Sequence, residues 1–119
     1  MRAIRQVAQN GDLVFFSAID EGVVLTITEP ADMAEQLGRE LARLCMPERP
    51  AAILAFDCIL RRLEAQEKQR TAQISDLLRR YRVVGFSTYG EQFGPIHVNQ
   101  TMTGIAIYPP GTMLPEKVL

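Results

Sequence analysis

Polar side chains gather in one short segment near the end of the chain. Residues 85–92, Gly-Phe-Ser-Thr-Tyr-Gly-Glu-Gln, place hydroxyl, amide and carboxylate groups around two glycines. Gly90 permits a close approach of the backbone or a positive φ, so the groups around it could orient a small polar ligand. The candidate groups are those of Thr88, Tyr89, Glu91 and Gln92. An ordinary polar turn is the alternative interpretation.

The next segment, residues 96–108, is predicted to be a single strand. Alternation along it puts four polar side chains on one face, those of His97, Asn99, Thr101 and Thr103. Such a row fits either the solvated face of an exposed sheet or the polar wall of a pocket. The polar segment just before it favours the pocket.

A cysteine stands where a predicted strand passes into a helix. Asp57 and Cys58 precede that helix, and Arg61 and Arg62 follow within its first turn. A thiol at the positive end of a helix can act as a nucleophile, and His97 could serve as its base. The alternative is that Cys58 is a small buried side chain and Asp57 caps the helix.

His97 is the only histidine of the chain. It has no cysteine or carboxylate at metal-ligand spacing, so the sequence predicts no zinc site. A haem needs only one axial ligand from the protein, and His97 would be that ligand if haem is bound. The cofactor is otherwise unknown from the sequence.

Composition and charge restrict the class of protein. The chain has 119 residues, of which 47% are hydrophobic and 23% charged, as in one folded domain and unlike a disordered chain. A net charge of −1 gives no overall attraction for nucleic acid or anionic lipid. Residues 61–82 hold seven basic and three acidic residues, but a Glu64–Lys68 pair at i,i+4 spacing indicates an exposed helix face. We therefore expect no nucleic-acid partner.

The sequence also predicts where the protein is found. Its longest apolar runs, residues 13–19 and 23–27, are far shorter than the roughly 20 residues needed to span a bilayer. No signal peptide is visible. Cys45 and Cys58 form no CxxC pair and no disulfide framework, which favours a reducing compartment. We expect a cytoplasmic protein without a membrane span.

Hydrophobic periodicity predicts the elements that position these residues. Residues 13–19 and 23–28 are expected to pair as a hairpin across Gly22, with both faces of the hairpin covered. Asp32 is expected to cap an amphipathic helix that ends near Cys45. Residues 51–56 and a segment beginning with residues 83–86 are predicted to be further strands. Residues 109–119 are expected to form an irregular tail.

Residues 59–81 keep one apolar helical face, at positions 59, 60, 63, 74, 77, 78 and 81, but are polar in the middle. One long helix or two helices meeting near Thr71, which could cap the second, both explain this pattern, and we slightly favour two. The whole pattern predicts an α+β fold, a largely antiparallel sheet of about five strands with helices packed on one face.

Three blocks of the sequence resemble the C-terminal domain of FIST (F-box and intracellular signal transduction) sensory proteins, a bacterial family. They are residues 52–64, Ala-Ile-Leu-Ala-Phe-Asp-Cys-Ile-Leu-Arg-Arg-Leu-Glu, residues 84–92, Val-Gly-Phe-Ser-Thr-Tyr-Gly-Glu-Gln, and residues 97–107, which hold His-Val-Asn-Gln-Thr and Thr-Gly-Ile-Ala-Ile. Residues 2–25, with their Asn-Gly-Asp-Leu and Ala-Ile-Asp-Glu-Gly turns, are also similar to the family.

This resemblance implies a sensory module without catalytic activity. It implies binding of a small molecule, either an amino-acid-like ligand or haem that senses nitric oxide, and relay to a histidine kinase, a cyclic-di-nucleotide enzyme or a chemotaxis transducer. A FIST N-terminal domain, in the same or a partner chain, is also implied. Residues 1–108 would then be the later part of a longer domain, with an incomplete pocket and exposed apolar sheet that favours a homodimer.

The predicted ligand-binding residues combine the polar segments with the start of the second helix. They are Asp57, Cys58, Arg61, Thr88, Tyr89, Gly90, Glu91, Gln92, His97, Asn99 and Thr101. Arg61 is expected to pair with an anionic group of the ligand, and Glu91 to meet an ammonium group or to fix Arg61. The alternatives are a protein-interaction or dimerisation domain that senses nothing and, less favoured, a cysteine-dependent enzyme.

Overall fold

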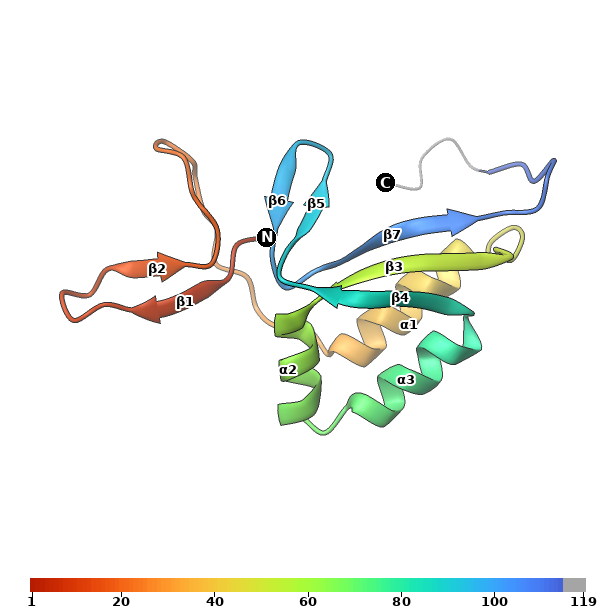
Figure 1. Cartoon of the computed structure of the whole chain (residues 1–119), viewed down its shortest axis with the longest axis horizontal. Coiled ribbons are helices and arrows are strands. Elements are labelled where there is room, and N and C mark those ends of the chain that lie inside the picture. Colours follow the sequence, from red (N-terminus) through yellow and green to blue (C-terminus); the bar gives the residue numbers. More distant parts are fainter. Residues whose placement is uncertain (115–119) are drawn as a thin grey trace.

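In the computed structural model, residues 1–114 are described, and they form a small sheet with three helices on one face and two separate hairpins (Figure 1). The helices are α1 (Met33–Leu44), α2 (Ile59–Glu67) and α3 (Thr71–Arg80). The strands are β1 (Ile4–Val7), β2 (Leu13–Phe15), β3 (Ala52–Cys58), β4 (Val83–Thr88), β5 (Glu91–Phe93), β6 (Ile96–Val98) and β7 (Met102–Ile107).

The central sheet has the order β4-β3-β7. Strand β3 runs parallel to β4 and antiparallel to β7. Helices α2 and α3 connect β3 to β4, as parallel neighbours require a long crossover. The α+β class is therefore confirmed, with a mixed central sheet in place of the largely antiparallel sheet that the sequence predicted.

The hydrophobic core lies between the helices and the inner face of this sheet. Leu37 and Leu41 of α1, Ile53 of β3 and Ile74 of α3 are buried there, and Ala65 of α2 joins them. The end of α1 is also fixed, because the Tyr108 hydroxyl donates to the carbonyl of Leu44 at 2.6 Å. The core thus holds α1 and α3 against one side of β3.

The start of α1 follows its predicted signals. Asp32 caps the helix, its Oδ1 accepting from the Glu35 N–H at 2.9 Å. Two helices replace one in residues 59–81, as we favoured, but Arg70 occupies the cap position of α3 and Thr71 is the first helical residue. Leu63 was expected on the buried face but is more than half exposed. Helix α2 turns Ala65, and not Leu63, toward the core.

The hairpin predicted across Gly22 is wrong. Strand β2 pairs instead with β1, antiparallel across the turn at Gly11, which adopts a φ of +90°. A turn does occur at Gly22, where φ is +84°, but residues 23–28 form no strand and their apolar side chains are exposed. The turn at Gly22 was therefore predicted correctly, but the partner of β2 was not. That partner is β1, which the sequence pattern did not indicate as a strand.

The single strand predicted for residues 96–108 is also wrong. It is divided into β6, which pairs with β5, and β7, which pairs with β3. Gln100 between them has a φ of +54°, outside the extended region that a strand requires. The four alternating polar residues consequently do not share one face.

Residues 109–114 contain no helix or strand, and the last five residues of the expected irregular tail lie outside the described part. Within the described residues no helix is both long enough and apolar enough to cross a membrane.

Candidate functional site

The site begins where the two parallel strands end. Register places Asp57 beside Ser87 and Cys58 beside Thr88 at the carboxyl ends of β3 and β4. Ligands of α/β proteins commonly bind at this edge of parallel strands. The Cys58 N–H donates to the carbonyl of Thr101 at 3.0 Å, which brings the start of β7 to the same place.

A buried carboxylate ties these strands to the β5–β6 hairpin. Glu91, the first residue of β5, is only 3% exposed. Thr88 donates its hydroxyl to Oε1 of Glu91, and Thr101 donates to Oε2 at 2.7 Å. Because both carboxylate oxygens accept hydrogen bonds from the protein, Glu91 fixes the hairpin, and the described residues show its hydrogen bonds going to the two threonines and not to Arg61.

Asp57 positions Arg61 instead. Asp57 Oδ1 accepts from Arg61 Nε at 2.7 Å, and the Arg61 side chain is only 13% exposed. Burial raises the pKa of Asp57, the positive charge of Arg61 opposes this rise, and the negative charge of Glu91 adds slightly to it. Among the described residues Arg61 has no other hydrogen-bond partner, so its two terminal Nη groups remain able to donate.

A groove of about 350 Å³ adjoins this pair, between α1 and the inner side of β7. We call it the α1–β7 groove. Its apolar wall includes Leu37, Leu41, Leu44, Met102 and Ala106, and its polar residues include Gln36, Glu40, Arg61, Gln100 and Thr101. Thr101 belongs both to the groove and to the Glu91 cluster, so the ends of β3 and β4 lie beside the groove. The arrangement can hold a small amphipathic molecule with one anionic end.

A comparison with protein families matches the FIST C domain over residues 1–94. The chain belongs to the FIST C domain family. This membership is consistent with a sensory signal-transduction domain. Comparison with curated proteins gave no match, and comparison with solved structures gave none either.

The FIST C domain brings together only some of the residues predicted to bind a ligand. Asp57, Arg61 and Thr101 meet at the groove or beside it, and Thr88 and Glu91 form the adjoining cluster. Cys58 is completely buried at the end of β3.

The other predicted residues lie on the β5–β6 hairpin and its flanks, outside the groove wall. Tyr89 is 91% exposed, and Gln92 is exposed and donates to the carbonyl of Gly94 at 2.9 Å. Asn99 is 1% exposed, and its Oδ1 accepts no hydrogen bond from the described residues. His97 lies opposite Gln92 in the hairpin.

The surroundings of His97 do not fit a haem. The residue is exposed on a three-residue strand, and its Nε2 lies so close to Gly90 that a Cβ there would overlap it. A side chain at position 90 would require the His97 ring to move, and in the structure Nε2 faces the backbone of Gly90. An axial ligand needs a free ring nitrogen above an apolar cavity, and the groove wall does not include His97.

Sequence reasoning missed the apolar wall of the groove. The leucines of α1 are core residues, as their helical stripe predicts, but the stripe does not show that they also border a groove. The available signal was the small residues of β7, Gly104 and Ala106, on its inner side. Small side chains at these positions leave space between the strand and α1.

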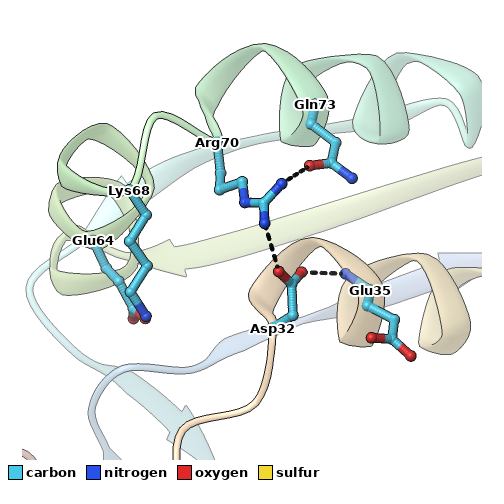
Figure 2. A network of polar contacts seen from close by, with 6 residues as sticks. All are labelled: Asp32, Glu35, Glu64, Lys68, Arg70 and Gln73. Atoms are coloured by element: carbon cyan, nitrogen blue, oxygen red, sulfur yellow. Dashed lines mark hydrogen bonds and ion pairs between the residues drawn. The ribbon is translucent and has the colours of Figure 1, made fainter.

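A second cavity of about 490 Å³ lies between the start of α1 and the α2–α3 junction, and its charged groups are already paired (Figure 2). Arg70 donates to Asp32 Oδ2 and to Gln73 Oε1, both at 3.1 Å, while Lys68 and Glu64 are 2.6 Å apart. The Glu64–Lys68 pair predicted from i,i+4 spacing is thus confirmed. This network joins the first turns of α1 and α3, so we assign it to the fold.

Among the described residues, no group of three or more histidine, cysteine, aspartate or glutamate residues is placed to hold a metal ion.

Proposed function

We propose that this FIST C domain senses a small carboxylate that has an apolar part, held in the α1–β7 groove with its carboxylate on Arg61. The observation that carries the proposal is the guanidinium of Arg61, fixed through Nε by Asp57 and lining the groove with its Nη groups unused by the described residues. An apolar amino acid and a short fatty acid both have the chemistry that this groove accepts.

Preorganisation of Arg61 supports an anionic ligand. The ion pair with Asp57 holds the guanidinium in one orientation before a ligand arrives, which lowers the entropy lost on binding. A carboxylate that meets the two Nη groups would form charge-assisted hydrogen bonds, which are about twice as strong as neutral ones. Asp57 reduces the net charge at the site, so the groove favours a single carboxylate over a multiply charged anion.

The size and the wall of the groove support an apolar remainder. Its volume of about 350 Å³ lies at the lower end of the range for small-molecule sites, roughly 300–1,000 Å³. Leu37, Leu41 and Leu44 place three leucine side chains along one helix face of that wall. A ligand of several carbon atoms can therefore displace water from apolar surface while its carboxylate stays at Arg61.

We propose binding without turnover. Cys58 is completely buried at the N-terminus of α2, which counts against the cysteine-enzyme alternative, because a nucleophile must reach its substrate. The domain would then pass its bound state to a partner. A FIST N-terminal domain, and a histidine kinase, cyclic-di-nucleotide enzyme or chemotaxis transducer in the cytoplasm, are the proposed partners. Haem-based sensing of nitric oxide is not part of the proposal, because the surroundings of His97 do not fit haem.

Calorimetric titration of the purified chain with hexanoate, hexan-1-ol and L-leucine tests the proposal. Hexanoate and hexanol share the apolar tail and differ in the carboxylate, so we expect hexanoate to bind at least about tenfold more tightly, equivalent to about 1.4 kcal/mol. Arg61→Gln, which keeps a donor for Asp57, should remove that preference. Arg62→Gln changes the exposed neighbour on the same helix and should leave it intact.

Two results would overturn this proposal. One is a folded Arg61→Gln protein that binds hexanoate as tightly as the unchanged chain. The other is the absence of saturable binding of any of the three probes at millimolar concentration, which would remove a small carboxylate as the ligand class.

A further inference from the structure

The face of the central sheet opposite the helices is apolar and exposed. We call it the outer face, and it consists of Leu54, Phe56, Val84, Phe86, Ile105 and Ile107. Register aligns Leu54 with Val84 on one side and Ile105 on the other, so these side chains form a continuous surface across three strands. All three helices lie on the other side of the sheet (Figure 1).

This exposure is large for side chains of a packed sheet. Phe86 is 63% exposed, and Val84, Ile105 and Ile107 are each more than half exposed. Taking about 200 Å² for a fully exposed phenylalanine and about 100 Å² for an aliphatic side chain, the outer face exposes on the order of 350 Å² of apolar surface. The largest apolar patch on a typical soluble monomer has this size, roughly 300–600 Å², and is often functional.

The outer face carries aromatic side chains at its centre and no charged residue. Phe56 and Phe86 pack edge to face, with their ring centroids 5.2 Å apart. The neighbouring positions on this face in β4 and β7 are occupied by Thr88 and Thr103, which can contribute a polar rim. An aromatic centre with a polar rim is the arrangement that carries most of the energy of protein interfaces.

We propose that the outer face binds a second copy of this chain, sheet against sheet, as an isologous dimer. A standard interface contains about 450 Å² of apolar surface per partner, and the outer face supplies most of that area. A face without charge meets its own copy without like-charge repulsion, and the net charge of −1 adds little repulsion between two chains. It also offers no charge pattern that would select a different, charged partner.

The geometry of such a dimer follows from the sheet. Two sheets that pack face to face lie about 10 Å apart, with their strands within about 30° of each other. The α1–β7 groove lies mainly on the inner side of β7, and Ile105 is the one residue of the outer face that also borders it. A substitution on the outer face can therefore abolish the dimer without abolishing ligand binding in the groove, so the two proposals can fail independently.

Sedimentation equilibrium of the full chain over a range of concentrations tests the dimer. We expect a reversible monomer–dimer equilibrium, and Phe86→Glu should weaken it by at least about a hundredfold, because each dimer then buries two unpaired charges. Phe93→Glu is the matched control, since Phe93 is 57% exposed but lies in the separate β5–β6 hairpin. This control should dimerise like the unchanged chain.

Because Phe86 is already exposed, Phe86→Glu should keep its circular dichroism spectrum and bind hexanoate like the unchanged chain. Val84→Glu gives a second test at a position whose side chain is also exposed. A chain that stays monomeric at every concentration would overturn the proposal and leave another domain as the occupant of the outer face. A dimer that both variants leave unchanged would overturn it as well.

Discussion

Asp57 Oδ1 and Arg61 Nε lie 2.7 Å apart at the point where β3 passes into α2. Asp57 is the last residue but one of the buried strand and Arg61 lies in the first turn of the helix, so the two are four positions apart in the chain. The strand therefore fixes the guanidinium that lines the α1–β7 groove. Stability and the proposed ligand recognition would share this ion pair, and the two contributions can be separated.

A double-mutant cycle on this pair should show strong coupling. Asp57→Ala and Arg61→Ala each leave a partly buried charge without its partner, and each should lower the free energy of unfolding by about 1–3 kcal/mol. Their coupling energy, measured by urea denaturation, should be about 1–2 kcal/mol. The exposed pair Glu40 and Arg43, with 2.9 Å between their charged atoms, is the control and should couple by less than about 1 kcal/mol. Additive effects of Asp57→Ala and Arg61→Ala would contradict the prediction.

The raised pKa of Asp57 predicts the pH dependence of Asp57→Asn. Because burial raises this pKa above the ordinary value of 3.8, the folded protein holds a proton that the unfolded chain has already released. The contribution of Asp57 to stability therefore falls as the pH rises from the unfolded pKa through the raised folded pKa. The difference in unfolding free energy, variant minus unchanged chain, should rise through this window and level off above it.

Glu64 titrates with the opposite sign, because its hydrogen bond from Lys68 lowers its pKa, but its contribution is common to both proteins and cancels in the difference. Urea denaturation at several values between about pH 3 and pH 7 measures the curve. A flat difference across that range would show that Asp57 is not desolvated in the folded protein.

Glu91 should stabilise the β5–β6 hairpin. Glu91→Ala leaves the hydroxyls of Thr88 and Thr101 without their shared acceptor, so we expect a loss of about 1–3 kcal/mol in unfolding free energy. Hydrogen exchange should show that the amides of β5 and β6 lose protection before those of β3. Gln92→Ala, at the exposed neighbouring position, should change stability by less than about 0.5 kcal/mol. Equal protection of the hairpin in both variants would contradict this role.

Local signals in the sequence predicted the fold where they were complete within one segment. Helix α1 has its cap at Asp32 and its apolar stripe, with Pro47 and Pro50 soon after its end, and it forms as expected. The hairpin at Gly22 failed because a turn residue specifies a bend and does not name a partner strand. The strand expected for residues 96–108 failed because the positive φ of Gln100, where the chain leaves β6 for β7, has no sequence signal at a glutamine.

The site was predicted in part for the same reason. Asp57 and Arg61 are four positions apart, so their contact follows from helical spacing. Thr101 and Glu91 were both predicted as site residues from their side-chain chemistry. Their hydrogen bond was not predicted, because it depends on how the chain runs from β5 to β7. The α1–β7 groove depends on how far apart a helix and a strand lie, which no single segment encodes.

Two glycines test the packing of the central elements in opposite directions. A Cβ at Gly38, in the middle of α1, would lie 3.5 Å from Leu77 Cδ2, an ordinary contact. Gly38→Ala should therefore raise the unfolding free energy by about 0.5–1 kcal/mol, because alanine loses less backbone entropy in a helix. A Cβ at Gly85 would instead overlap the carbonyl oxygen of Ala55 on the neighbouring strand. Backbone cannot move aside as a side chain can.

Gly85→Ala should consequently force β3 and β4 apart and lower the unfolding free energy by about 3 kcal/mol or more. Thermal and urea denaturation of the two variants measure both effects with the same change of residue. If Gly85→Ala left stability unchanged or raised it, the close approach of β4 to β3 at Gly85 would be wrong. If only Gly38→Ala failed to stabilise, the contact of α1 with α3 at Leu77 would be tighter than 3.5 Å and the pairing of β3 with β4 would stand.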